Sequence, residues 1–286
     1  MKKMVAFLLF VSMLFCSYMV VYSEDGFDDD LAANIRDIIE NQKGYYSIAL
    51  KDLETGDELL INNKVIRSAS VIKIYVMIEA FRQISFGKLD INEKIVLKDS
   101  MKVGGTGILQ RSKVGTKITY KRLIELMMTV SDNTATNMLI NRLGMDNINE
   151  SADFLGCKDT RIENLLMKAR SNKSKKYNTT SVRDLMLVLE RIYRNECLGS
   201  PYDQEMIEIM TRAKSRDKLP RLIPSNCRIA HKTGRMSHYE HDAGIIYTSK
   251  GDYIICVMSM KLPSSEKGKQ VIAEISKKAY NSYINN

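Results

Sequence analysis

Three short groups of polar residues along the chain could together build a nucleophilic active site. The first is a serine followed three residues later by a lysine, Ser70 and Lys73, where a polar stretch becomes a helical pattern. One helical turn brings both side chains to one face, so the amine can reach the hydroxyl. A lysine among apolar neighbours and other cations loses part of its preference for the charged form and can act as a base. The pair alone is weak evidence, because the same spacing recurs, for example at Ser85 and Lys88.

The other two groups add a hydroxyl, an amide and a further lysine. Ser131-Asp132-Asn133 follows one apolar helical run and opens another, and Lys232-Thr233-Gly234 ends an apolar strand. Each of these two groups also has a purely structural interpretation. The Ser-Asp-Asn group could be a helix N-cap, and the Lys-Thr-Gly group could be an edge-strand lysine followed by a turn glycine. Their order, at a helix start, a helix–helix loop and a sheet edge, favours one shared active site instead.

This trio is the pattern of the class A β-lactamases and penicillin-binding proteins, and the chain resembles that family from about Asp28 to its C-terminal helix. Longer matches carry the resemblance further: the block Ser131–Asn137, the Gly-Thr-Gly-Ile-Leu-Gln stretch at 105–110, Thr179-Thr180, Ala230–Gly234 and His241–Ile246. The resemblance implies a serine hydrolase that forms an acyl-enzyme with a β-lactam or a D-Ala-D-Ala-type peptide. It implies neither a cofactor nor a metal.

The resemblance also assigns roles to individual residues. Ser70 would attack the carbonyl, Lys73 would act as its base, and Ser131 would pass a proton to the leaving nitrogen. Substrate-binding roles would fall to Asn133, Lys232, Thr233, Gly234 and Arg235. Among these, the asparagine would hold the substrate's side-chain amide, and the lysine and threonine its carboxylate. The backbone N–H groups of Ser70 and Arg235 would form an oxyanion hole, in which one donor commonly contributes ~3 kcal/mol.

The chain departs from the family where a class A β-lactamase carries the glutamate that activates water for deacylation. When the segment is anchored on Thr160-Arg161, the glutamate position is Leu166 and the expected asparagine is Arg170. Glu163 is the only carboxylate in this segment, and it is the alternative candidate for the deacylation base. We therefore expect acylation to be intact and hydrolysis of the acyl-enzyme to be slow.

Metal-ligating residue types occur after the third group, at His238, Glu240 and His241. Their spacing lacks the helical H-E-x-x-H geometry, so we expect a substrate-loop or surface role and no metal. Asp242 beside them is typical of a turn former or of a ligand. Family members often carry an arginine two residues before this aspartate, where this chain has Glu240.

Two further functions stay open beside a hydrolase acylated by β-lactams. A D,D-carboxypeptidase, amidase or esterase acting on peptidoglycan-type peptides fits the missing glutamate, because peptidases of this fold deacylate without it. A non-catalytic domain that binds or senses peptidoglycan is the other alternative. Retention of the whole candidate set argues against it: Ser70, Lys73, Ser131 and Lys232.

Periodicity predicts an α/β (α+β) fold around these groups, and the resemblance implies that it is of the β-lactamase/transpeptidase type. Strand-like runs lie near both ends of the chain, at 45–53, 58–62, 228–233, 243–248 and 253–260. Helical periodicity dominates between them and at both termini. We expect a five-stranded antiparallel sheet with flanking terminal helices and an inserted all-helical domain. The sheet domain would span 24–66 and 213–286, and the helical domain 67–212, with the active site at their interface.

The N-terminus of the 286-residue sequence has the composition of a signal peptide. Lys2 and Lys3 precede an apolar run that ends near Ser23, which predicts a signal peptide or an N-terminal anchor over 1–23. We expect the protein to be exported, either secreted or membrane-anchored. Outside the cell four later cysteines could pair in three ways, and their state is left open: Cys157, Cys197, Cys227 and Cys256.

The net charge of +9 comes from basic residues that are scattered rather than striped, which argues against nucleic-acid binding. The densest basic patch falls in a polar stretch that we interpret as a solvated loop: Lys168, Arg170, Lys173, Lys175 and Lys176. Attraction to an anionic cell-wall polymer is compatible with this charge. We expect a monomer.

Overall fold

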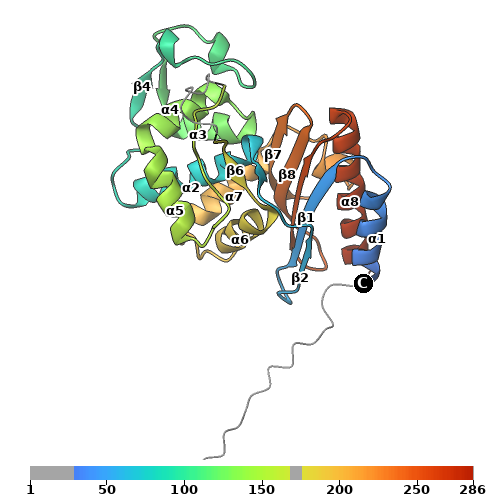
Figure 1. Ribbon diagram of the computed structural model, residues 1–286. Helices are drawn as coiled ribbons and strands as arrows, with labels where there is room; N and C mark the ends of the chain where they lie inside the picture. Colours follow the sequence, from blue (N-terminus) through green and yellow to red (C-terminus); the bar gives the residue numbers. More distant parts are fainter. Residues whose placement is uncertain (1–28, 168–175, 286) are drawn as a thin grey trace, which may run out of the picture.

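One antiparallel sheet forms the centre of the computed structural model, which describes residues 29–167 and 176–285 (Figure 1). The sheet has five strands in the order β2-β1-β9-β8-β7. Their bounds are β1 Tyr45–Asp52, β2 Glu58–Ile61, β7 Ile229–Met236, β8 Tyr239–Ile246 and β9 Tyr253–Met260. The predicted fold class is confirmed, because strands from both ends of the chain join in this sheet.

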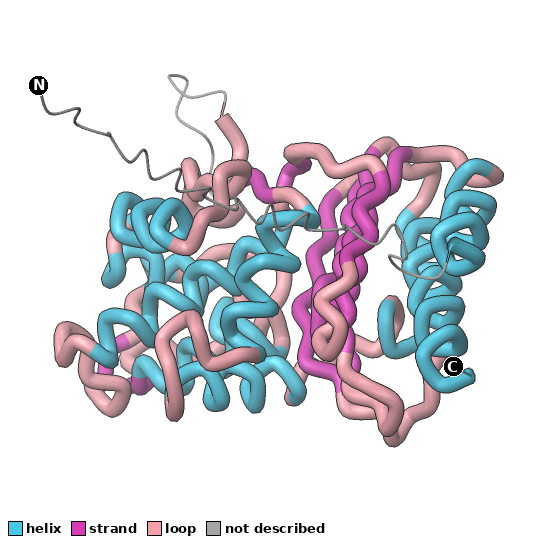
Figure 2. The backbone as a smooth tube through the Cα atoms, turned by 90° about the horizontal axis from the view of Figure 1, so that it is seen from below, coloured by secondary structure: helices cyan, strands magenta, loops and turns pink. Residues whose placement is uncertain are grey.

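Two helices from the ends of the chain cover one face of the sheet. α1 (Asp29–Glu40) and α8 (Ser265–Asn285) pack together, and Figure 2 shows the pair on one side of the strands. They bury apolar side chains at helical spacing, such as Leu31 and Ile35 from α1 and Ile275 from α8. Burial of one such side chain stabilises the fold by ~1.5–3 kcal/mol.

The opposite face of the sheet packs against a group of helices. These are α2 (Lys73–Ser85), α3 (Tyr120–Thr129), α4 (Asn133–Leu143), α5 (Met145–Phe154), α6 (Val182–Tyr193) and α7 (Tyr202–Thr211). α2 runs through their middle and is buried on nearly all sides, as an inner helix must be. The start of α2 is therefore held by the core, which fixes the candidate nucleophile and lysine at that end.

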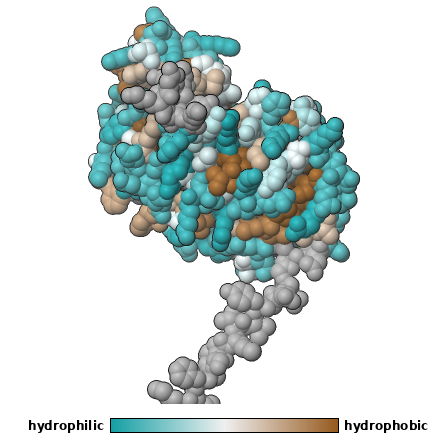
Figure 3. Space-filling view, in the orientation of Figure 1, coloured by the Kyte–Doolittle hydropathy of each residue, from teal (hydrophilic) through white to brown (hydrophobic). Residues whose placement is uncertain are grey.

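Short elements complete the fold and connect the sheet to the helices. They are the ribbon β3 (Ile66–Arg67) with β6 (Thr179–Thr180), the ribbon β4 (Lys94–Val96) with β5 (Lys117–Thr119), and the 3-10 turns η1 (Ala69–Ile72), η2 (Asp99–Met101), η3 (Leu109–Arg111) and η4 (Leu219–Arg221). The face of the molecule drawn in Figure 3 is mostly hydrophilic, with a smaller apolar area over the sheet. None of the helices within 29–167 and 176–285 is long and apolar enough to cross a bilayer.

The hairpin of β7 and β8 is longer than the sequence pattern predicted. β7 continues through Gly234, β8 begins before Ala243, and His238 makes the turn between them with a φ of 65°. Gly234 is therefore a strand residue and not a turn glycine. Glu240 and His241 were expected in a substrate or surface loop, but they lie in an inner strand with 0% exposure. The prediction was wrong because these polar side chains are buried against partners distant in sequence.

The structure does not test the expectations for the signal segment, the basic loop and the domain boundaries. The expected signal segment 1–23 and the basic residues 168–175 lie outside the described residues. The domain boundaries stay a prediction. All four cysteines of the described part are free thiols, and Cys256 is fully buried in β9 as a small apolar side chain.

Candidate active site

Ser70 lies in η1 directly before α2 and lines a cleft of about 710 Å³ between the helices and the edge strand β7. The turn is tight, because Ala69 has a φ of 45° in the left-handed region. β7 passes so close that a Cβ on Gly234 would lie 3.2 Å from the backbone nitrogen of Ser70. Glycine at this strand position therefore lets the sheet edge reach the serine.

Lys73 begins α2 and is fully buried. Its Nζ donates to the Ser131 carbonyl oxygen at 2.7 Å, to Ser131 Oγ at 3.0 Å and to Asn133 Oδ1 at 2.9 Å. These contacts occupy the three N–H directions of an ammonium, and Ser70 is not among its partners. Burial and the charge of Lys232 hold the pKa of Lys73 well below its ordinary value, against an opposing effect of Asp132. A lysine with a lowered pKa is suited to act as a base.

Ser131 Oγ lies between two buried amines, 3.0 Å from Lys73 Nζ and 3.1 Å from Lys232 Nζ. A hydroxyl has two acceptor lone pairs and one proton, so accepting from both amines leaves the O–H free to donate into the cleft. Ser131 has a φ of 55°, and Thr106 Oγ1 donates to its carbonyl oxygen at 2.7 Å. Such a strained backbone persists only where its surroundings hold it, and it often marks a functional position.

Asp132 is the structural member of the Ser-Asp-Asn group. Its carboxylate accepts the backbone N–H groups of Ile108, Leu109 and Ala135 at 2.7–2.9 Å. It thereby caps α4 and ties the 104–109 loop to the helix start. Asn133 follows with its amide between Lys73 and this loop, and its Nδ2 donates to the carbonyl oxygen of residue 104 at 3.2 Å.

Lys232 in β7 is buried, and its Nζ also donates to the Thr233 carbonyl oxygen at 2.8 Å. Burial and, after it, the charge of Lys218 lower the pKa of Lys232 to about 7, although Asp242 opposes the shift. The charge of this side chain is therefore sensitive to pH in the neutral range. Thr233 and the exposed Arg235 continue the strand and line the cleft.

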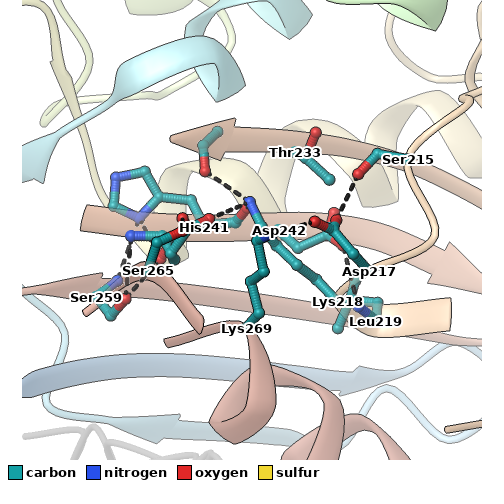
Figure 4. A network of polar contacts seen from close by, with 12 residues as sticks. Ser215, Asp217, Lys218, Leu219, Thr233, His241, Asp242, Ser259, Ser265 and Lys269 are labelled. Atoms are coloured by element: carbon teal, nitrogen blue, oxygen red, sulfur yellow. Dashed lines mark hydrogen bonds and ion pairs between the residues drawn. The ribbon is translucent and has the colours of Figure 1, made fainter. Parts of the chain in front are cut away.

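Lys218 supports this strand from behind and was not predicted as a site residue. Its Nζ donates to the carbonyl oxygens of Gly234 at 2.8 Å and His241 at 3.0 Å, and it pairs with Glu240 Oε2 at 2.7 Å (Figure 4). Ammonium and carboxylate are both buried, so each depends on the other for compensation. In the sequence, the spacing of Ser215 and Lys218 is one of several chance matches and gives no signal of this role.

The polar residues of β8 hold strands together and do not line the cleft. His241 Nε2 donates to the Arg67 carbonyl oxygen at 2.8 Å, and its Nδ1 accepts the backbone N–H of Ser259 at 3.1 Å. Burial lowers the pKa of His241 to about 4, so the ring is neutral at ordinary pH. Asp242 accepts from His231 Nδ1 at 2.8 Å inside the sheet and is neither a turn former nor a free ligand.

The loop expected to carry a deacylating carboxylate brings Leu166 and Met167 to the cleft instead. Asn137 fixes Leu166, because its side-chain amide bonds both the carbonyl and the N–H of that residue at 2.8 Å. Among the described residues that line the cleft, Asp217 is the only carboxylate, and Lys269 pairs with it at 2.7 Å.

Glu163, the alternative base, does not belong to the cleft lining. Its carboxylate pairs with Lys176 at 3.5 Å, and its backbone N–H donates to Asn178 Oδ1 at 2.8 Å. The structure therefore brings together every predicted site residue except Glu163. Sequence reasoning did not single out several residues of the cleft, and of the following only the first lies in a stretch matched to the family: Thr106, Met167, Lys214, Asp217, Lys218 and Lys269.

Comparisons with known proteins agree with this geometry. A family model described as the beta-lactamase enzyme family matches residues 30–283. Beta-lactamase BRO-1 of Moraxella catarrhalis is 23% identical over 221 residues, which cover 74% of this chain and 71% of that protein.

Among solved structures, a beta-lactamase from Sphaerobacter thermophilus has a TM-score of 0.85 at 24% identity, covering 91% of this chain and 99% of that one. PBP-A has a TM-score of 0.83 at 28% identity, covering 90% and 97%. A leucine-to-glutamate mutant of PBP-A, solved as an acyl-enzyme complex with penicillin G, has the same TM-score at 27% identity and the same coverage.

The buried pair of Lys218 and Glu240 generates a prediction about stability. Lys218→Met should lower the free energy of unfolding by about 3–5 kcal/mol, because it leaves the Glu240 carboxylate buried without a countercharge. The double variant Lys218→Met/Glu240→Met should recover most of this loss. Urea denaturation measures both values, and a double variant no more stable than Lys218→Met would contradict the coupling.

Proposed function

The chain belongs to the beta-lactamase enzyme family, and from this premise we propose that β-lactams acylate it at Ser70 and that the acyl-enzyme is hydrolysed slowly. It is a β-lactamase-like serine hydrolase. One observation carries the proposal: Ser70 shares its cleft with Ser131, whose hydroxyl contacts two buried lysines, while Leu166 stands where a water-activating carboxylate is expected.

The arrangement of Ser70, Lys73 and Ser131 supports the acylation step. Ser70 Oγ attacks the lactam carbonyl carbon and gives its proton to the neutral form of Lys73, which burial and the charge of Lys232 favour over the ammonium by lowering the pKa of this lysine. The C–N bond of the lactam then breaks, and the nitrogen takes the hydroxyl proton of Ser131. Lys73 returns a proton to Ser131 across their 3.0 Å hydrogen bond. The proton released by Ser70 is thereby balanced by the one that the leaving nitrogen gains.

The edge strand β7 supplies the substrate contacts in this proposal. Lys232 and Thr233 bind the carboxylate, and the backbone N–H groups of Ser70 and Arg235 polarise the carbonyl, where one donor is worth ~3 kcal/mol. The close approach of Gly234 to the Ser70 nitrogen supports this assignment, because it brings the strand backbone beside the attacking oxygen.

The described residues that line the cleft include no carboxylate suited to act as a base, which supports slow deacylation, because hydrolysis needs a base that activates water. Leu166 is apolar, and Glu163 does not line the cleft. Burial would raise the pKa of Asp217, but its contacts with Lys269 and Ser215 outweigh this and lower it to about 2. Asp217 is therefore a weak base, and we expect the acyl group to react slowly with water.

The β-lactamases among the relatives do not favour the carboxypeptidase or the non-catalytic alternative. The acyl-enzyme that the PBP-A mutant forms with penicillin G supports penicillins as acylating ligands of this fold. We further propose export, on the composition of residues 1–23, and the fit of this basic protein to anionic cell-wall polymers stays a prediction.

A chromogenic cephalosporin tests the proposal directly. When the cephalosporin is in excess over the protein, it should give a burst of one product molecule per protein, followed by slow turnover. The reason is that acylation is fast and deacylation is slow. Mass spectrometry should find the adduct on Ser70, and Ser70→Ala should show neither burst nor adduct. Sustained fast turnover would contradict the proposal that deacylation is slow. A wild-type protein without an adduct would contradict the proposal that Ser70 is acylated.

Leu166→Glu should accelerate loss of the acyl group, because it places a carboxylate in the cleft. A general base contributes ~10²–10⁴-fold, so we expect at least about a tenfold faster decay of a penicilloyl adduct. The decay is followed by mass spectrometry after excess penicillin is removed. Glu163→Gln is the matched control and should decay as the wild type does; slower decay in this control would make Glu163 the base.

Acylation by benzylpenicillin should slow as the pH rises above about 7. Lys232 loses its charge as the pH passes its pKa of about 7, and the neutral amine attracts the substrate carboxylate less strongly. Lys232→Arg should move this fall to higher pH, because the guanidinium stays charged. The second-order acylation rate measured across pH tests this, and a wild-type rate that does not fall on the alkaline side would contradict it.

A further inference from the structure

The cleft is neutral at one end and charged at the other. The neutral end is formed by Gly105, Thr106, Leu166 and Met167, and a Cβ on Gly105 would touch both Met167 and the Asn133 amide. The charged end is formed by ionisable side chains of the 213–218 loop and of α8: Lys214, Asp217, Lys218 and Lys269. Figure 4 draws three of them, Asp217, Lys218 and Lys269, beside the strand that carries Thr233.

Positive charge exceeds negative charge along the cleft. Five cationic side chains line it against one carboxylate, that of Asp217: Lys214, Lys218, Lys232, Arg235 and Lys269. Two cations are compensated, Lys269 by Asp217 and Lys218 by Glu240, each at 2.7 Å. Lys214 and Arg235 are exposed and have no ion-pair partner within 29–167 and 176–285. One substrate carboxylate on Lys232 therefore leaves the cleft with uncompensated positive charge.

The charged end is the leaving-group end of the proposed reaction. Ser131 gives its proton to the departing atom, and its hydroxyl is 3.1 Å from Lys232 Nζ. Behind Lys232, Lys218 bonds the Gly234 carbonyl oxygen of the same strand at 2.8 Å. A group attached to the departing part of the substrate, next to its carboxylate, therefore extends toward the 213–218 loop and α8.

We propose that this enzyme prefers substrates whose leaving part carries a second acidic group, beside the carboxylate bound by Lys232. The inference rests on the proposed function. The ligand class is an amide, ester or thioester of an acyl group with a dicarboxylic amino, hydroxy or thio acid. Lys214 and Lys269 lie at the end of the cleft that receives the second acid. The side chain of Lys269 is 17% exposed, so its charge is only partly screened by solvent.

Two thioesters with the same N-acylglycyl group isolate this preference. One has mercaptoacetate as its leaving thiol, with one carboxylate, and the other has mercaptosuccinate, with two. Attack by Ser70 forms the ester bond, breaks the C–S bond and releases the protonated thiol. Both reactions leave the same acyl-enzyme, so differences in deacylation cancel. The initial burst of thiol gives the acylation rate, which we expect to be about tenfold higher for the dianionic thioester at low salt and less so at high salt.

Variants at the charged end separate this preference from general reactivity. Lys214→Ala and Lys269→Ala should each reduce the preference about two- to fivefold, the range for a partly exposed charge. Asp217→Asn should increase it, because the only repelling carboxylate is removed. Lys250→Ala is the matched control: Lys250 lies in the β8–β9 turn, at the opposite end of the strands from Arg235, and the preference should not change.

The two levels of the proposal fail in different ways. Equal acylation rates for the two thioesters, with a burst from each, would overturn the dianionic preference and leave the proposed function standing. A preference that persists unchanged in both lysine variants would overturn the assignment to this end of the cleft. Absence of any Ser70 adduct from either thioester and from benzylpenicillin would overturn the proposed function and this inference together.

Discussion

Two buried amines that share one hydroxyl define the site. Ser131 Oγ contacts Lys73 and Lys232 at 3.0 and 3.1 Å, and both lysines are shielded from water. Burial lowers the pKa of each lysine; the charge of Lys232 adds to this effect on Lys73, and the charge of Lys218 adds to it on Lys232. In the proposed reaction, proton transfer and attraction of the substrate carboxylate both depend on this balance. The same burial makes the arrangement costly, so the surrounding structure has to hold it in place.

That support comes from elements far apart in the sequence. The buried helix α2 holds Lys73, the Asp132 carboxylate fixes the start of α4, and Gly234 lets β7 approach the nucleophile. Behind β7, Lys218 and Glu240 form a compensated pair that anchors the strand backbone. The serine is thus positioned by the core, while the described residues that line the cleft place Leu166 where a water-activating carboxylate is expected.

Sequence patterns predicted the sheet, its terminal helices and those residues of the cleft that belong to the three motifs, because these follow from local periodicity and from short motifs. They did not predict the extended β7–β8 hairpin. Glu240 and His241 are polar and were therefore assigned to a loop, and only the structure shows the buried partners that allow them to lie in a strand. Lys218 was missed for the same reason: its partners are the Gly234 and His241 carbonyl groups and Glu240. Leu166 was located by counting from an anchor, but its immobilisation by Asn137 is visible only in three dimensions.

The central claim is that acylation is complete and deacylation is impaired, and the lifetime of the Ser70 acyl-enzyme tests it most directly. Intact-protein mass spectrometry follows the benzylpenicilloyl adduct after the free antibiotic has been removed. A typical enzyme completes a cycle in about 0.1 s. We predict an adduct that persists for minutes or longer. An adduct lost within about a second, or no adduct at all, would contradict the account.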